Sequence, residues 1–288
     1  MKFNHMVAEW LSAKEPKLQK SSLDTYRAWL ATIVLPALGE KEEITEQDIH
    51  TFLDTLKASG VKQSSYRNYV NMVRRILRFG AERGWCQYPS WVMGLQSKEF
   101  KSEKPPVLLN AQQEAALIGF LMSNTSPRNL GMFLSLTFGL RLGEVCDLRW
   151  GDIDLSKHTI RVIEGPGQLR RLPIPPQMRP FLKICGIGKE SATYVCTGTT
   201  KPLPSPKSIR DSLKVVAKNL DLPVLTFNDL RHNFTVRCIR SGCSFATLMS
   251  LLGYSNAQLL YEEYKPFFPV NGSEAMNAQF ACVLPEME

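Results

Sequence analysis

Hydrophobic residues recur at helical spacing through the first third of the chain. The pattern predicts four helices, over residues 3–13, 22–36, 45–60 and from 64 or 65 onward. Pro36 and Gly39 are expected to close the second helix, and Thr45-Glu46-Gln47-Asp48 resembles a capping box that opens the third. We therefore expect residues 1–95 to form a bundle of four or five helices.

The fourth of these helices has two distinct faces. On a helical projection its apolar residues, from Tyr66 to Leu77, occupy one side, and an arginine stripe lies beside them, made of Arg67, Arg74, Arg75 and Arg78. A positive stripe next to a buried one is typical of a helix that lies along DNA phosphates or in a groove. A solvated basic face is the alternative interpretation.

A charged, proline-terminated stretch separates the two parts of the chain. Residues 96–106 run through alternating lysines and glutamates to Pro105 and Pro106, a composition typical of a linker. The second domain is then expected over 107–288, and the tail beyond Pro269 could hold a short helix.

The second domain combines helices with a small amount of β-structure. Helices are expected after the cap Asn110 and over 128–140, 177–184 and 205–220. Residues 159–163 and 170–175 are predicted to form a hairpin whose turn is Gly165-Pro166-Gly167, and 194–196 is a possible further strand. The chain is thus predicted to be mainly α with a small β component.

Composition excludes several classes of protein. The 288-residue chain has no apolar run of 18 residues and no apolar stretch typical of a signal peptide, so neither a membrane span nor secretion is indicated. Its seven cysteines form no C-x-x-C pair and its four histidines are scattered, so we expect no metal site and no disulfide framework. Free thiols suit a reducing cytoplasm. The net charge of +8 favours a polyanionic partner.

Two arginines occupy positions that are unfavourable for an unpaired positive charge. Arg141 is flanked by leucines at the end of an apolar helix, so it must be paired, either with Glu144 or with a ligand anion. Arg231 falls in the first turn of a helix predicted over 229–240, with Asn228 or Asp229 as its cap, where the helix dipole favours anions. A bound phosphate would resolve that conflict. The alternative is a surface arginine paired with Asp229 or Glu262.

The order of short motifs resembles the tyrosine recombinase (phage integrase) family. Gly-Leu-Arg-Leu-Gly-Glu at 139–144 is followed by the hairpin, by Asp-Leu-Arg-His at 229–232, by Leu-Leu-Gly-Tyr at 251–254, and by Tyr264 before Lys-Pro-Phe. The resemblance covers nearly the whole chain. It implies a helical core-type DNA-binding domain, a linker and an α+β catalytic domain.

The resemblance also implies a chemistry and residue roles. A tyrosine attacks a DNA phosphodiester and forms a 3′-phosphotyrosyl link, so strands can be exchanged without metal or cofactor. Arg141 and Arg231 match the two arginines that bind the phosphate, and Glu144 matches the acidic residue that steadies the first. Tyr264 matches the nucleophile. Tyr261 is the alternative nucleophile, because Tyr264 follows Tyr254 by one residue more than is usual.

Three positions depart from the family pattern. Asn228 occupies a position where histidine is usual, and Tyr254 one where histidine or tryptophan is usual. Gly165 aligns with the hairpin lysine that commonly protonates the leaving oxygen. Asn228 cannot carry a proton near neutral pH, whereas Tyr254 can still donate a hydrogen bond. Arg170 and Arg171, which we expect to contact DNA, could reach the site, but an arginine is a poor general acid.

These departures leave more than one function open. The main hypothesis is a site-specific recombinase or integrase of a phage or other mobile element. It would act on double-stranded DNA as a tetramer on two duplexes, with possible help from an accessory DNA-bending or directionality protein. The alternatives are a catalytically impaired DNA-binding protein on the same scaffold, a type IB topoisomerase, or a helical transcription regulator.

Overall fold

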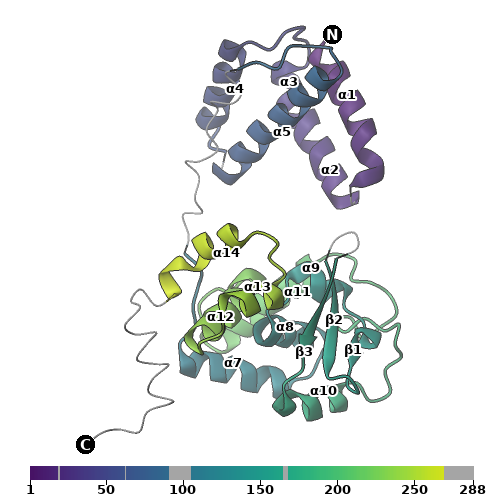
Figure 1. The fold of residues 1–288 in the computed structure, drawn as a ribbon, viewed down its shortest axis with the longest axis vertical. Coiled ribbons are helices and arrows are strands. Elements are labelled where there is room, and N and C mark those ends of the chain that lie inside the picture. The colour runs from purple at the N-terminus through teal and green to yellow at the C-terminus, as the bar shows by residue number, and fades with distance from the viewer. Residues whose placement is uncertain (19, 62, 91–104, 165–167, 269–288) are drawn as a thin grey trace, which may run out of the picture. The chain divides into compact units, whose positions relative to one another are not determined.

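The computed structural model describes residues 1–18, 20–61, 63–90, 105–164 and 168–268. The chain divides into two compact units, Met1–Pro105 and Pro106–Glu288, and Figure 1 shows the helices of the first and the mixed structure of the second. Most of the predicted linker and the whole predicted C-terminal tail lie outside the described residues. The mainly helical fold with a small sheet, predicted from the sequence, is confirmed.

The first unit is a helical bundle with its own core. Its elements are α1 (Phe3–Lys14), α2 (Lys20–Trp29), a π-helical turn (Leu30–Val34), α3 (Leu35–Leu38), α4 (Glu46–Ala58) and α5 (Gln63–Glu82). Side chains from all the longer helices meet in the interior, among them Trp10, Leu30, Phe52 and Ile76. The predicted capping box is present: Thr45 and Asp48 exchange hydrogen bonds at the start of α4.

The prediction that Pro36 closes the second helix is wrong. Pro36 lies in the first turn of α3, which follows the π-helical turn directly. In that turn the Leu35 N–H bonds to the Leu30 carbonyl, which is the wider spacing of a π-helix. The helical path therefore runs on to Gly39.

The basic stripe of α5 lies apart from its buried face. Tyr69, Val70, Val73, Ile76 and Leu77 are buried in the bundle core. Arg67, Arg75 and Arg78 are exposed and Arg74 is half-buried. Arg75 also donates a hydrogen bond of 3.1 Å to the Tyr26 hydroxyl of α2, which limits the directions in which this guanidinium can point.

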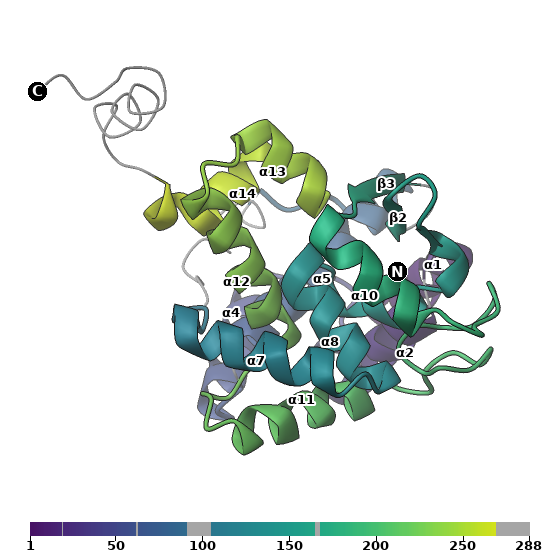
Figure 2. The ribbon, with the colours of Figure 1, turned by 90° about the horizontal axis from the view of Figure 1, so that it is seen from below.

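The second unit surrounds one buried helix. Its helices are α7 (Ala111–Ser123), α8 (Pro127–Phe138), α9 (Leu142–Asp147), α10 (Arg179–Cys185), α11 (Lys207–Asn219), α12 (Phe227–Arg240), α13 (Phe245–Leu252) and α14 (Ala257–Tyr264). Helix α8 is almost wholly buried and packs against α7, α9, α11 and α12. Figure 2 shows α7, α11 and α12 around it, seen from below. This burial agrees with the apolar composition of residues 128–140.

The sheet of the second unit is small and antiparallel. Strands β1 (Ile153–Asp154), β2 (Thr159–Glu164) and β3 (Gln168–Pro173) lie in that order, with Ile160 opposite Leu172 and Val162 opposite Arg170. The predicted hairpin is confirmed, whereas β1 is too short for its pattern to be recognised. The strand expected at 194–196 is wrong, because Tyr194 makes only an isolated bridge to Arg149 before the chain turns.

Helix α12 begins earlier than its sequence suggested. Thr226 is the N-cap, and its hydroxyl and the Asp229 carboxylate form a capping box, so neither Asn228 nor Asp229 caps the helix. Asp229 also accepts a hydrogen bond from the Val107 N–H. Asn228 consequently sits inside the first turn and is exposed. Within the described residues, no helix combines the length and apolar character that crossing a membrane requires.

Candidate active site

The second unit contains a pocket of about 380 Å³ that gathers residues far apart in the sequence. It lies where the start of α9, the first two turns of α12 and the C-terminal end of α14 meet. Its lining consists of Arg141, Leu142, Gly143, Asn228, Arg231, His232, Tyr254, Glu263 and Tyr264. All the catalytic residues predicted from the sequence line this pocket except Glu144, which holds one of them in place.

Arg231 is held by the ends of two helices. Its side chain is buried, and its guanidinium donates to the Gly139 carbonyl at 2.6 Å and to the Leu252 carbonyl at 2.7 Å. These carbonyls lie at the C-terminal ends of α8 and α13, where the helix dipole is negative. Both helices can end there because Gly139 and Gly253 adopt left-handed conformations, with φ of 68° and 66°.

This arrangement corrects the surface alternative for Arg231. Neither Asp229 nor Glu262 pairs with it: the Asp229 carboxylate is engaged by Val107 and Thr226, and the guanidinium is turned into the protein. Burial, followed by the nearby charge of Arg141, lowers the pKa of Arg231 from its ordinary value. Two carbonyls engage two of its five N–H donors, so a bound anion can take others and relieve the repulsion between the arginines.

Arg141 is oriented by Glu144. It is the N-cap residue of α9, and its N–H and Nη1 donate to the two Glu144 carboxylate oxygens at 2.7 and 2.9 Å. The predicted pairing of the two residues is therefore present. The Arg141 Nη2 also lies 3.4 Å from the Gly253 carbonyl oxygen, so the end of α13 helps to position both arginines.

Arg170 takes part in the same cluster instead of facing solvent. It is buried on β3, and its Nη1 and Nη2 each donate at 2.8 Å to Glu144. This bidentate contact gives Arg170 a supporting place behind Arg141, which the prediction of a DNA contact did not anticipate. Arg171 is the exposed arginine of the strand and lies opposite Arg161. Gly165, the position aligned with the hairpin lysine, lies outside the described residues.

Replacing Glu144 with glutamine should destabilise the fold. Burial alone would raise the pKa of this carboxyl, but the contacts with Arg170 and Arg141 outweigh burial and lower it. Loss of the carboxylate leaves the buried Arg170 charge uncompensated, which costs about 3 kcal/mol in the free energy of unfolding. Thermal melting of the full chain measures this, with the exposed Glu190→Gln variant as control. An unchanged melting temperature contradicts the pairing.

The same carboxylate gives stability a defined pH dependence. Because its folded pKa is lowered, its contribution is fully present above the ordinary value of 4.5 and is lost as the pH falls through the folded value. Acid should therefore destabilise the wild type more than Glu144→Gln. The difference between their melting temperatures should narrow below about pH 4.5.

The two candidate nucleophiles are in different surroundings. Tyr264 is 1% exposed, and its hydroxyl lies 2.7 Å from the His232 Nδ1. Burial is the main cause of a raised pKa of Tyr264, so the phenol is protonated at rest. Tyr261 is 47% exposed, stacks on Phe268 and does not line the pocket. The geometry thus favours Tyr264 over Tyr261.

Tyr254 lies between the arginines and the end of α14. Its ring centroid is 5.6 Å from the Arg231 guanidinium carbon and 5.7 Å from that of Arg141. Its hydroxyl donates to the Glu263 Oε2 at 2.6 Å. Burial, followed by the contact with Glu263, raises the pKa of Tyr254 to about 12. Its hydroxyl therefore remains a hydrogen-bond donor at neutral pH.

Two pocket residues were missed in the sequence. His232 follows Arg231 in the Asp-Leu-Arg-His motif, and Glu263 directly precedes Tyr264. The His232 Nε2 lies 3.7 Å from the Glu263 Oε1. Adjacency to a predicted catalytic residue was the signal available for both, but the direction in which each side chain points is visible only once α12 and α14 pack together.

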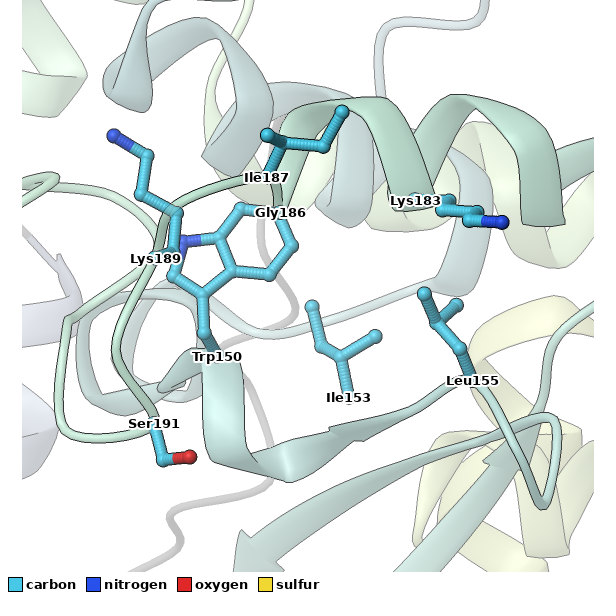
Figure 3. Close-up of a pocket in the computed structure, with 8 residues that line it drawn as sticks. All are labelled: Trp150, Ile153, Leu155, Lys183, Gly186, Ile187, Lys189 and Ser191. Carbon is cyan, nitrogen blue, oxygen red and sulfur yellow. The ribbon is translucent and has the colours of Figure 1, made fainter.

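A second pocket of the same unit has a different lining. This pocket, of about 200 Å³, lies beside α10 and is drawn in Figure 3; it places the Trp150 ring among aliphatic side chains, with the Lys183 and Lys189 ammonium groups toward its rim. Its lining includes no arginine and no tyrosine. Among the described residues, no three His, Cys, Asp or Glu side chains gather as a metal-binding group.

Comparison with known proteins agrees with this fold. The phage integrase family matches residues 108–266. A tyrosine recombinase of Thermosipho africanus (strain TCF52B) is 24% identical over 87% of this chain and 91% of its own length. The fold resembles a Tn1549 transposon integrase bound to a circular-intermediate DNA, with a TM-score of 0.75, 13% identity and coverage of 99% of this chain and 100% of that one.

A second solved structure shows the same likeness. A lambda integrase tetramer bound to a Holliday junction superimposes with a TM-score of 0.68 and 18% identity, over 94% of this chain and 78% of that one. The architecture is that of an integrase-type protein. Because the family match spans more than half of its length, the chain belongs to the phage integrase family, the tyrosine recombinases.

Proposed function

We propose that this protein cuts and rejoins double-stranded DNA through a 3′-phosphotyrosyl intermediate, as a site-specific recombinase. The observation that carries the proposal is the convergence of Arg141, Arg231 and Tyr264 on one pocket. Two guanidinium groups and a phenol are what attack on a phosphodiester needs, since the cations bind its non-bridging oxygens and the phenol supplies the nucleophile.

The residues divide the work as follows. Arg141 and Arg231, held by Glu144 and by helix-end carbonyls, donate hydrogen bonds to the phosphate as charge develops on it. Tyr264 forms a bond to phosphorus while the bond to the 5′-oxygen breaks. The reverse reaction, by the 5′-hydroxyl of another strand, rejoins the DNA and releases the tyrosine. Asn228 at the pocket can hydrogen-bond a phosphate oxygen.

We assign DNA binding to residues 1–95, with Arg67, Arg74, Arg75 and Arg78 of α5 on the phosphates, and catalysis to 107–288, with Arg171 as an additional DNA contact. The likeness to a lambda integrase tetramer on a Holliday junction supports action as a tetramer on two duplexes. The likeness to a transposon integrase supports an origin in a phage or other mobile element.

A second candidate is a catalytically impaired DNA-binding protein on this scaffold. It is favoured by Asn228, which cannot move a proton, and by the engagement of the Tyr254 hydroxyl with Glu263. Loss of general-acid assistance slows such chemistry by about 10²–10⁴. The first candidate predicts slow cleavage, whereas the second predicts none.

A covalent trapping experiment separates the two. A duplex selected from a random-sequence pool by binding to the full chain is resynthesised with nicks placed at successive positions, so that cleavage releases a short 5′-hydroxyl fragment and traps the intermediate. A recombinase gives an adduct that survives denaturation and leaves the DNA blocked at its 3′ end. Tight, salt-sensitive binding without an adduct at any nick position establishes the impaired protein instead.

A further inference from the structure

His232 lies directly behind the proposed nucleophile. Its Nδ1 is 2.7 Å from the Tyr264 hydroxyl oxygen, and the two rings pack with centroids 5.4 Å apart. His232 comes from the second turn of α12 and Tyr264 is the last residue of α14, so the contact joins the two helices. A neutral imidazole whose Nδ1 accepts this hydrogen bond carries its own proton on Nε2.

Glu263 lies on the other side of the imidazole. Its Oε1 is 3.7 Å from the His232 Nε2, and its Oε2 accepts the Tyr254 hydroxyl at 2.6 Å. The carboxylate therefore favours the tautomer with the proton on Nε2 and stabilises the imidazolium that forms when Nδ1 gains a second proton. The order phenol, imidazole, carboxylate is that of a nucleophile, a base and the group that orients the base.

From this geometry we infer that His232 is the general base that takes the Tyr264 proton, and that Glu263 positions and stabilises it. This rests on the proposed function. In the cleavage step the phenol proton moves to the His232 Nδ1, the Tyr264 oxygen bonds to phosphorus, and the 5′-oxygen leaves and takes a proton from water. Rejoining reverses each transfer and returns the proton from Nδ1 to the phenolate.

The surroundings of His232 suit a base near neutral pH. Burial is the main cause that lowers the pKa of His232 from its ordinary value of 6.5, and Glu263 opposes that effect. The charged and titratable groups that face the ring are Glu263, Asp229, Arg231, Tyr254 and Tyr264. The imidazole is therefore neutral and able to accept a proton above about pH 6.5.

The matched test is His232→Asn. The asparagine side chain can present a hydrogen-bonding atom close to the position of Nδ1, but it cannot accept a proton. Adduct formation is measured on the selected suicide duplex, after the wild type has been shown to cleave it. We expect cleavage at neutral pH to fall by about 10²–10⁴ and the decline of the wild-type rate below pH 6.5 to disappear.

A sulfur substitution distinguishes a base from an acid. A duplex with sulfur in place of the bridging 5′-oxygen has a leaving group that needs no proton, so it restores cleavage only to variants that lack a general acid. The His232→Asn defect should persist on it. If His232→Asn cleaves the sulfur-substituted duplex at the wild-type rate, or cleaves the ordinary duplex at the wild-type rate, the inference is overturned. The proposed function stays in place in either case.

The role of Glu263 has its own readout. In Glu263→Gln the imidazolium loses its stabilising charge, so the acid-side decline of the cleavage rate should move to lower pH by about one pH unit. Glu262→Gln, an exposed neighbour on the same helix, should leave the decline unchanged. If the acid-side decline of the cleavage rate stays at the same pH in Glu263→Gln, the positioning role of Glu263 is contradicted. Absence of any adduct in the wild type refutes the proposed function instead.

Discussion

Tyr264→Phe is expected to form no covalent adduct with DNA. Phenylalanine fills the same buried space, because the Tyr264 ring is 1% exposed and packs between His232 and Phe267. Only the hydroxyl that would bond to phosphorus is lost. Removing a nucleophile typically lowers the rate by roughly 10⁶-fold, so cleavage of the suicide duplex should fall to background while binding to the same DNA is retained.

Tyr261→Phe is the matched control for this variant. Tyr261 lies on the same helix three residues earlier and is exposed outside the pocket, so the substitution should leave the adduct yield unchanged. If the adduct persists in Tyr264→Phe and disappears in Tyr261→Phe, the nucleophile is Tyr261, and α14 must rearrange when DNA binds.

Arg231→Lys is expected to slow cleavage by about 10²–10³. Lysine keeps the positive charge, but it is a point donor on a flexible stem and cannot satisfy the Gly139 and Leu252 carbonyls while also donating to a phosphate. The loss should appear in the cleavage rate measured with saturating protein. Affinity for the selected duplex should change by less than about tenfold, since the proposed function assigns other phosphate contacts to the arginines of α5.

Arg179→Lys provides the comparison for Arg231→Lys. Arg179 donates a hydrogen bond to a carbonyl of the same unit, that of Ile174, but it does not line the pocket. Its conversion to lysine should leave cleavage within about twofold of the wild type, the ordinary range for a residue outside the transition state. Equal losses in both variants would mean that Arg231 acts through folding and not through the phosphate.

The helices could be predicted because their signals are local. The apolar face of α5, the capping box at Thr45 and the buried composition of α8 each depend on residues within one or two turns. Pro36 was misread because the helical path continues past it after a π turn, and that turn has no sequence signature.

The site could be predicted only in part. Arg141, Arg231 and Tyr264 could be identified through family resemblance, and the pairing of Arg141 with Glu144 followed from the cost of burying an unpaired cation among leucines. The place of Arg170 behind Glu144 depends on the register of β3 against β2, which no local pattern encodes. His232 and Tyr264 are thirty-two residues apart in the sequence, so their contact depends on how α12 and α14 pack.

The most direct test is to identify the amino acid that carries the DNA. The complex trapped on the suicide duplex is digested with protease and nuclease, and the nucleotide-bearing peptide is sequenced by mass spectrometry. A phosphotyrosyl nucleotide at Tyr264, lost when Arg141 or Arg231 is replaced, is the predicted result. Attachment at any other residue, or no attachment in a protein that binds the duplex tightly, would contradict the convergence of these three side chains on one phosphate.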